Sequence, residues 1–367
     1  MNKRVAVLPG DGIGPEEMEA SLPLLQTVAA ARCHQIELRK GLVGWAAYDV
    51  YRDVMPEETW DICGSSDAIL FGAVGMPGRD TEVPRDMRPE RRALLPIRKR
   101  FGLGVNIRPV RVYPGLESVS SIPHAFKGGE WLTFFRELLG GDYFGEKRRS
   151  PDGRAWAEDV CRYERSQIEL IARAAFGEGR RTGEMVTSVD KANVLDATGE
   201  YWREVVTEVH DKEFPEVALQ YALVDSLSAH LVKRPKDFRI VLASNAHGDI
   251  LSDEGAAIFG SLGLMPSASL NPATGYGMYE PAAGSAPDIA GKGIANPIGM
   301  ILSIALMFRH TFQDERAAQA IEQAVEKTLA KGFRTSDIAS KSGGERIVGT
   351  EDMASAITDE LVSEIAE

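Results

Sequence analysis

The stretch "VAVLPGDGIGPEEM", residues 5–18, decides between two kinds of α/β fold. An apolar run ends at Pro9, glycines follow at positions 10, 12 and 14, and Pro15 stands where a helix would begin. Proline suits the first turn of a helix because it lacks the N–H that would have no acceptor there. A Rossmann fingerprint needs a third small residue, but the next candidate position holds Glu17. The turn is therefore rich in glycine without matching the dinucleotide fingerprint, and the rest of the chain has to decide.

The composition is ordinary for a globular protein. The chain has 367 residues, of which 44% are hydrophobic and 26% are charged, enough for two domains or one large α/β unit. A net charge of −12 argues against nucleic acid as the main partner, because phosphate binding needs clustered Lys and Arg. Cys33, Cys63 and Cys161 lack metal or disulfide spacing, and the longest apolar helix candidate, 297–308, is too short to span a bilayer. We therefore expect a cytoplasmic protein without a membrane partner.

Strand and helix patterns alternate along the chain. Apolar runs predict strands at 4–9, 34–41, 67–75, 104–114, 130–138 and 238–245. Helical periodicity predicts helices at 16–32, 88–102, 164–179, 199–211, 248–263, 314–332 and 351–366. This alternation favours a mostly parallel sheet covered by helices. The charged, glycine-containing stretch 140–165 predicts a protruding hairpin or arm.

An acidic pair lies in "SNAHGDILSDE", residues 244–254. Asp249 and Asp253 are four residues apart, so on a helix they share one face, one turn from each other. Two such carboxylates repel unless a cation lies between them, and Mg²⁺ prefers oxygen ligands of this kind. The alternative is an exposed acidic start of a helix, which the helix dipole favours.

A lysine stands among small and apolar residues in "TSVDKANVLD", residues 187–196. Lys191 is a candidate base, because a lysine in such surroundings shifts its pKa readily; the alternative is a buried salt bridge. Asp225, in an amphipathic stretch, is able to pair with this lysine, to bind a metal ion or to cap a helix.

Three separated arginines, Arg98, Arg108 and Arg136, indicate a substrate with more than one carboxylate, since guanidinium groups bind carboxylates with two hydrogen bonds. Taken singly, each arginine is more typical of a surface or structural role. Tyr143 is a candidate acid or a packing residue. The small residues of 279–297 allow close backbone approach to a flat ligand, and Asp288 there suits a ribose diol and repels a 2′-phosphate. This pattern favours NAD over NADP, the alternative being a long surface loop.

The order of several motifs resembles the β-decarboxylating dehydrogenase family over residues 4 to 335. The motifs are "GDGIGPE", "FGAVG", "RPERRALLPIRK", "NIRP", "RELLGGDYFGE", "TSVDKANVLDATGEYWREVV", "SNAHGDILSDE", "LGLMPSASLN" and "GSAPDIAGKGIANPI". The resemblance implies an α/β, isocitrate/isopropylmalate dehydrogenase-like two-domain fold with a mixed parallel-antiparallel central sheet, and not a Rossmann fold. Residues 1–103 and 257–367 would form the cofactor-binding large domain. Residues 104–256 would form the substrate, metal and dimerisation domain, with the arm near 143–165.

The same resemblance implies a site shared by the two subunits of a homodimer. Mg²⁺ or Mn²⁺ would be bound by Asp249 and Asp253 of one subunit and by Asp225 of the partner subunit. Lys191 of the partner subunit would take the hydroxyl proton, and Tyr143 would protonate the enolate carbon. The implied substrate contacts are Glu90, Leu94, Leu95, Arg98, Arg108, Arg136 and Val194. The implied NAD contacts are Ile13, Gly75, Asn193, Gly284, Ser285, Ala286, Pro287, Asp288, Ile289 and Asn296.

The implied reaction is the NAD-dependent and metal-dependent oxidative decarboxylation of a 3-substituted malate. The first candidate is 3-isopropylmalate, a substrate of leucine biosynthesis, because Leu94, Leu95 and Val194 would cup an apolar substituent. Homoisocitrate, tartrate or malate, and a phosphonate analogue are the alternatives. A non-catalytic regulatory subunit and a Rossmann hydroxy-acid dehydrogenase are the other classes considered. The departures from the family pattern are Arg92, Leu139, Ala246, His247 and Ala283. Helical spacing places Arg92 at the rim of the pocket.

Overall fold

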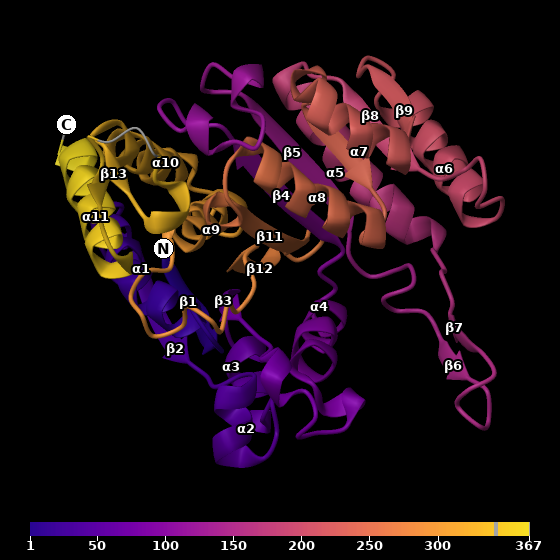
Figure 1. The fold of residues 1–367 in the computed structure, drawn as a ribbon, viewed down its shortest axis with the longest axis horizontal. Helices are drawn as coiled ribbons and strands as arrows, with labels where there is room; N and C mark the ends of the chain where they lie inside the picture. Colours follow the sequence, from indigo (N-terminus) through magenta and orange to yellow (C-terminus); the bar gives the residue numbers. More distant parts are fainter. Residues whose placement is uncertain (341–343, 367) are drawn as a thin grey trace.

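The computed structural model describes residues 1–340 and 344–366, and these residues contain one large mixed sheet (Figure 1). Its ten strands run in the order β2-β1-β3-β12-β11-β4-β5-β10-β8-β9. Their bounds are β1 Asn2–Gly10, β2 Gln35–Lys40, β3 Ala68–Ala73, β4 Val105–Arg111, β5 Trp131–Glu137, β8 Val186–Asp190, β9 Leu219–Leu223, β10 Ile240–Ala243, β11 Pro266–Asn271 and β12 Tyr276–Pro281. β4 is antiparallel to β5 and to β11, and β11 is antiparallel to β12, whereas the other neighbours are parallel.

Helices pack on both faces of this sheet. They are α1 Gly14–Ala31, α2 Trp45–Tyr51, α3 Glu57–Gly64, α4 Leu95–Arg100, α5 Arg165–Thr182, α6 Thr198–Glu213, α7 Val224–Lys233, α8 Asn245–Phe259, α9 Ile298–His310, α10 Glu315–Ala330 and α11 Thr350–Ala366. One core joins α1, α9, α10 and α11 to the β1 side of the sheet. Two further cores join α5 and α6, and separately α7 and α8, to the β5–β10–β8 side. Among the described residues, no helix is long and apolar enough to cross a membrane.

The mixed α/β fold agrees with the expectation, and the glycine-rich turn belongs to it rather than to a Rossmann unit. The predicted strands and helices are present with shifted ends. The helix expected at 248–263 is α8, which starts after Ser244 and ends at Phe259, before Gly260. The stretch 88–102 forms a π-helical turn, Glu90–Leu94, before α4. No prediction covered β8, β9, β11 or β12, which are short and have weak alternation. The division at 103/104 and 256/257 stays a prediction.

The expected arm is a two-stranded hairpin of β6, Lys147–Arg149, and β7, Ala157–Asp159. All residues of both strands are exposed, and the hairpin projects away from the body of the molecule (Figure 1). A smaller pairing also occurs near the C-terminus, between β13, Phe333–Arg334, and β14, Arg346–Ile347.

Glu17, in α1, carries a deeply buried carboxyl group. It is 1% exposed, and its Oε2 atom has no hydrogen-bond partner among the described residues. Burial, with smaller contributions from Glu16 and Asp337, raises the pKa of Glu17 from 4.5 to about 8. Glu17 is therefore mostly protonated at neutral pH.

This raised pKa predicts a pH-dependent stability. The contribution of Glu17 to the free energy of unfolding is largest below the unfolded pKa of 4.5. It decreases as the pH rises towards the folded pKa of about 8. Glu17→Gln removes this titration. Its melting temperature relative to that of the wild type should therefore increase steadily from about pH 5 to about pH 8, as measured by calorimetry. A difference that stays constant across this range would contradict the raised pKa.

Candidate active site

Two arginines and an asparagine share one face of the central sheet. Asn106 and Arg108 are two residues apart on β4, and Asn106 lies opposite Arg136 on the antiparallel β5. Side chains at this spacing and register point to the same face of a sheet. Helix α8 covers that face at close range, because a Cβ on Gly248 would lie only 2.7 Å from Cγ of Arg136. A side chain at position 248 would therefore push the helix away from the strand.

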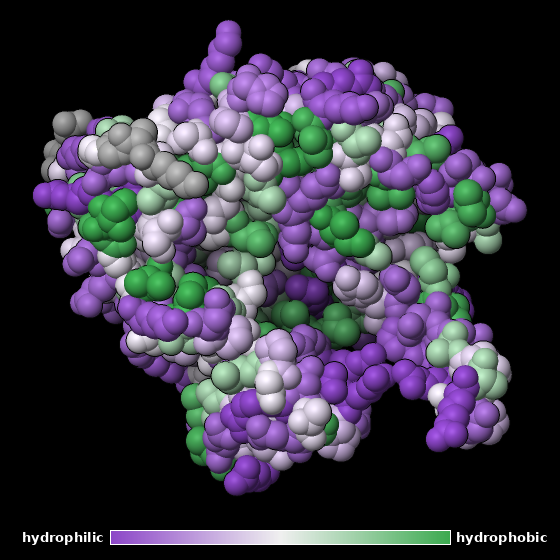
Figure 2. Space-filling model, viewed as in Figure 1, coloured by the Kyte–Doolittle hydropathy of each residue, from purple (hydrophilic) through white to green (hydrophobic). Residues whose placement is uncertain are grey.

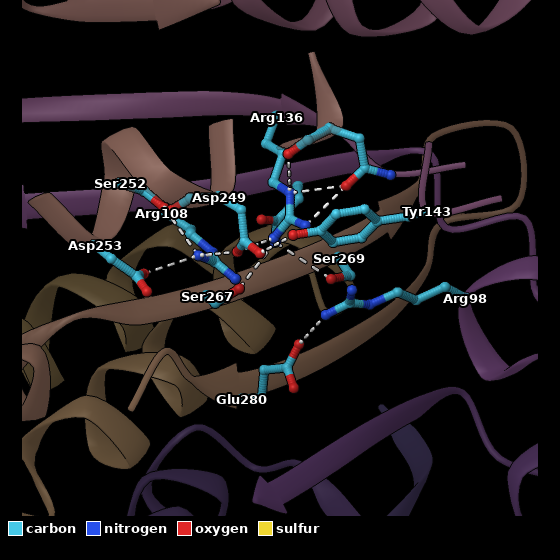
Figure 3. Close-up of polar contacts among 12 residues, drawn as sticks. Arg98, Arg108, Arg136, Tyr143, Asp249, Ser252, Asp253, Ser267, Ser269 and Glu280 are labelled. Atoms are coloured by element: carbon cyan, nitrogen blue, oxygen red, sulfur yellow. Dashed lines mark hydrogen bonds and ion pairs between the residues drawn. The ribbon is translucent and has the colours of Figure 1, made fainter. Parts of the chain in front are cut away.

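The side chain of Asp249 joins the two arginines and Tyr143 into one cluster (Figure 3). Its Oδ1 accepts hydrogen bonds from Arg136 Nη1 at 2.5 Å and from Arg108 Nη1 at 3.1 Å. Its Oδ2 accepts one from the Tyr143 hydroxyl at 2.8 Å. Arg108 also donates to Asp253 at 3.3 Å and to Ser252 at 2.8 Å. The cluster thus contains two predicted metal ligands, two predicted substrate contacts and the predicted acid.

The electrostatics of the cluster follow from its burial. Burial raises the pKa of Asp249, but the guanidinium groups of Arg136 and Arg108 more than offset this, so that its pKa lies below 3.8. Burial raises the pKa of Asp253, which has fewer cations nearby. Burial and the charge of Asp249 raise the pKa of Tyr143 to about 12. Tyr143 is thus a neutral hydroxyl with a proton to donate at physiological pH.

A second ion pair closes the opposite wall of the site. Arg98, at the end of α4, donates to Glu280 of β12 at 3.2 Å, and both side chains are buried. Asn106 donates to Ser267 at 2.8 Å and to Ser269 at 3.3 Å, both on β11. Sequence reasoning did not single out Glu280, Ser267 or Ser269. A carboxylate between apolar residues in "YGMYEP" was the available signal for Glu280.

Lys191 and Asp225 form a separate pair. Lys191 follows β8, Asp225 lies in the first turn of α7, and their Nζ and Oδ1 atoms are 2.5 Å apart. Among the described residues, no hydrogen bond or ion pair joins either of them to Asp249 or Arg108. Asp225 is not the N-cap, which is Leu223. Within one chain, the described residues thus show no direct polar contact between the predicted base and the cluster around Asp249.

The nearby residues Asn193 and Val194 are exposed. The Val194 side chain is 64% exposed in the single chain, which is unusual for an apolar residue expected to contact substrate. Leu94 and Leu95 are partly buried and lie on the other side of the site, with Leu94 packed against the core that contains Ile97. Arg92 is exposed and donates to Asp53 at 3.1 Å, as expected for a side chain at the rim.

Predicted cofactor residues meet where three turns come together. The backbone N–H of Ile13 donates to Ser285 O at 2.9 Å, and Ser285 Oγ donates to Gly75 O at 2.5 Å. A Cβ on Gly12 would lie 1.9 Å from Ser285 O, so only glycine permits this approach. Asp11, which sequence reasoning missed, accepts from Gly75 N at 2.9 Å. The glycine-rich turn therefore packs closely against the turn that contains Gly75 and the loop that contains Ser285.

The remaining predicted cofactor residues follow along the same loop. Gly284, Pro287 and Asp288 are exposed, Ala286 and Ile289 are partly buried, and Asn296 is buried. Glu90 also reaches this region, since its Oε1 would lie 2.3 Å from a Cβ on Gly75. Asn193 lies after β8, and among the described residues no hydrogen bond joins it to these turns. Figure 2 shows a hollow near the centre of this face of the molecule, with hydrophilic residues deep in the hollow and hydrophobic residues beside them.

Asp249 and Asp253 meet part of the needs of a divalent metal ion. They supply carboxylate oxygens one turn apart, which suit Mg²⁺ or Mn²⁺. Within residues 1–340 and 344–366, however, no group of three or more His, Cys, Asp or Glu side chains could hold a metal ion. The two carboxylates fit such an ion if another subunit or a substrate supplies further oxygens.

His247 and Leu139 are departures from the family pattern near this cluster. Burial lowers the pKa of His247, and its Nδ1 atom has no partner among the described residues. His247 is therefore a partly buried, neutral imidazole at neutral pH. The backbone N–H of Leu139 donates to the buried Glu137 at 2.7 Å, a contact that does not depend on the side chain.

Comparisons with known proteins identify the family of this chain. The family model described as isocitrate/isopropylmalate dehydrogenase matches residues 4–357. The 3-isopropylmalate dehydrogenase of Pseudoalteromonas translucida is 49% identical over 97% of this chain and 98% of its own length. That of Mannheimia succiniciproducens is 49% identical over 92% of this chain and 94% of its own. The solved structure of isocitrate dehydrogenase from Methylococcus capsulatus aligns with a TM-score of 0.85 at 30% identity, over 98% of this chain and 99% of that one. The chain belongs to the isocitrate/isopropylmalate dehydrogenase family.

Proposed function

We propose that the protein oxidises and decarboxylates 3-isopropylmalate, a step of leucine biosynthesis, with NAD as coenzyme and Mg²⁺ or Mn²⁺ as metal ion. Near-full-length relatives that are 46–49% identical are 3-isopropylmalate dehydrogenases. The observation that carries the proposal is the contact of Asp249 with Arg108, Arg136 and Tyr143 in one buried cluster. Two cations for carboxylates, a protonated acid and a pair of oxygen ligands are what this reaction requires.

The two buried arginines would hold the carboxylates of the malate. Arg108 and Arg136 are paired with Asp249 in the chain alone. Substrate carboxylates would replace Asp249 as their partners, since bidentate guanidinium contacts to carboxylates are strong. The Asp249 and Asp253 carboxylates would then be free to hold the metal ion. When bound, that ion polarises the oxygen on C2 of the substrate.

Proton transfers would be carried out by Lys191 and Tyr143. In its neutral, deprotonated form, Lys191 would accept the C2 hydroxyl proton while hydride leaves C2 for the nicotinamide. The resulting ketone would accept the electron pair released when the β-carboxylate leaves as carbon dioxide. Tyr143 would donate its proton to the enolate carbon, which its raised pKa permits. Asp225 has its pKa lowered by Lys191, so it is ionised and available as a metal ligand.

The apolar side of the pocket supports isopropylmalate over the anionic alternatives. Leu94 and Leu95 are partly buried beside the site, and burying a free carboxylate against them is costly without a cation. Arg92 is the nearest departure that adds a cation, but Asp53 already binds its guanidinium group. Homoisocitrate and phosphonate analogues would therefore bring a third anionic group without a matching cation, and tartrate and malate would bring no apolar group to cover these leucines.

We further propose that two subunits share each active site. Lys191 and Asp225 lie apart from the Asp249 cluster within one chain, so the partner's Lys191 and the partner's Asp225 would complete it. Ile250, the residue after Asp249, is 67% exposed, and Val232 on α7 is 47% exposed. Large contiguous apolar patches mark surfaces that bind other proteins, and these two exposed side chains on neighbouring helices would contribute to such a patch. The α7–α8 face and the arm are the proposed dimer surfaces, and the cytoplasmic location stays a prediction.

The direct test is NAD⁺ reduction, followed by absorbance, with Mg²⁺ and a panel of 3-substituted malates. We expect 3-isopropylmalate to give the highest kcat/KM, and EDTA to abolish turnover. Activity that survives EDTA, or a higher kcat/KM with an anionic analogue, would refute the proposal.

Mixing two inactive variants tests the shared site. Lys191→Met and Tyr143→Phe should each be nearly inactive as homodimers, because each removes one proton-transfer group from both sites. Unfolding and refolding an equal mixture should restore about a quarter of wild-type activity, because half of the dimers are heterodimers with one intact site. Refolding each variant alone is the control. If the mixture stays inactive while the wild type recovers, the two residues act within one subunit.

The coenzyme preference is expected to depend on Asp288. Its exposed carboxylate would bind the ribose diol of NAD and repel the 2′-phosphate of NADP. The wild type should therefore have the higher kcat/KM with NAD⁺, and Asp288→Lys should shift the ratio of the two kcat/KM values towards NADP⁺. Glu351→Lys, an equal charge change at an exposed position, serves as the control. Equal use of both coenzymes by the wild type would disprove the assignment.

A further inference from the structure

The loop of residues 284–296 is hydrogen-bonded to residues that have no role in the proposed reaction. The backbone oxygen of Gly293 accepts from Thr350 N at 2.9 Å, and that of Ala295 accepts from Thr350 Oγ1 at 2.7 Å. Asn296 donates to Asp337 at 3.0 Å and accepts from Ile298 N at 3.1 Å. These contacts fix the carbonyl oxygens of the loop and its last side chain.

Two backbone N–H groups of the loop have a different partner, Glu16. The Glu16 Oε2 atom accepts from Gly291 N at 2.9 Å, and its Oε1 accepts from Ala295 N at 3.4 Å. Glu16 lies in the first turn of α1, directly after the glycine-rich turn. One carboxylate therefore joins the turn that carries Ile13 to the loop that carries Asp288 and Asn296.

A simpler role for Glu16 would be to stabilise the start of its own helix. Acidic residues in a first turn interact favourably with the helix dipole. However, α1 has no side-chain cap hydrogen bond, and both carboxylate oxygens of Glu16 bind N–H groups of another segment. Glu19, three residues later on α1, is also acidic but is exposed and makes no contact with this loop in the described part of the chain. A comparison of Glu16 with Glu19 therefore distinguishes the effect of a negative charge on α1 from the effect of the hydrogen bonds to the loop.

We infer that Glu16 is a positioning residue for the coenzyme, which holds the backbone of residues 291–295 in the shape that receives the adenosine half. The inference rests on the proposed function, because it takes this loop to bind NAD. Glu16 itself would not touch the coenzyme or the substrate. Without it, the loop keeps its carbonyl anchors at Thr350 but has two N–H groups without their acceptor. The cost of ordering the loop would then lower the affinity for the coenzyme.

Loss of the Glu16 contacts should affect the binding of the adenosine half of NAD⁺ alone. The arginine cluster lies on β4, β5 and α8, and none of the contacts of Asp249 involves α1 or residues 291–295. Loss of the Glu16 contacts should therefore raise the KM for NAD⁺ and leave the KM for the malate substrate unchanged. The kcat at saturating NAD⁺ should also be unchanged, since the reacting atoms lie elsewhere.

The experiment compares Glu16→Ala, Glu16→Gln and the control Glu19→Gln in the full-length protein. Steady-state assays give kcat and both KM values, and calorimetry with ADP-ribose gives the Kd of the adenosine half without turnover. For Glu16→Ala we expect roughly a tenfold rise in the KM for NAD⁺ and in the Kd of ADP-ribose. Glu16→Gln keeps one acceptor oxygen and should show a smaller rise, and Glu19→Gln should match the wild type.

Two results would overturn the inference. One is a wild-type Kd for ADP-ribose in Glu16→Ala. The other is a loss of kcat or a rise in both KM values in parallel, which would indicate a general structural role. Failure of the proposed function has a different signature, because the wild type itself would then not reduce NAD⁺ with isopropylmalate. If Glu16→Ala does not fold, Glu16→Gln, which preserves size, decides by the same measurements.

Discussion

The burial of two guanidinium groups on one face of the central sheet is the constraint on which the site depends. Arg136 is 1% exposed and Arg108 is 6% exposed, and cations at such positions are costly unless they are paired. Asp249 is the counter-ion that the chain supplies, and it reaches them because Gly248 lets α8 lie close to β5. The Tyr143 hydroxyl then binds the second oxygen of the same carboxylate. The acid, the anion-binding groups and the proposed metal ligands are thus positioned by one ion cluster.

The sheet also explains why the proposed chemistry divides between two surfaces. Strand β10 separates β5 from β8 in the sheet, so Arg136 and Lys191 emerge from strands that are not neighbours. Within the chain, Lys191 pairs with Asp225, which satisfies both charges at an exposed position. A charged pair at the surface contributes little to stability, so the fold of the single chain does not depend on it. The exposure of Val194 and Ile250 supports the same division.

On the cofactor side, order depends on backbone contacts between segments far apart in the chain. Ile13, Gly75 and Ser285 come from three turns, and they are joined by short hydrogen bonds around Gly12. A loop built in this way needs few large side chains, because the surrounding turns satisfy its polar groups. This leaves the exposed part near Asp288 available to a ligand while its ends stay fixed.

Much of the site was predictable from the sequence, because local spacing determines it. The helical spacing of Asp249 and Asp253 predicted a metal site or an acidic helix start, and the motif around Lys191 predicted a base or a buried salt bridge. The mixed sheet followed from the family resemblance, and the proposed roles of these residues stay predictions. Asp11 and Glu280 were missed, because their importance comes from partners at Gly75 and Arg98 rather than from their neighbours in sequence.

Local sequence sets which residue types are available and which of them share a helix face or a strand end. The placement of β11 antiparallel between β4 and β12, and the pairing of Asp249 rather than Lys191 with Arg108 and Arg136, appear only in the folded chain. The difference lies in the range of the interactions. Periodicity and capping act within a few residues, whereas strand register and the pairing of buried charges join segments more than a hundred residues apart.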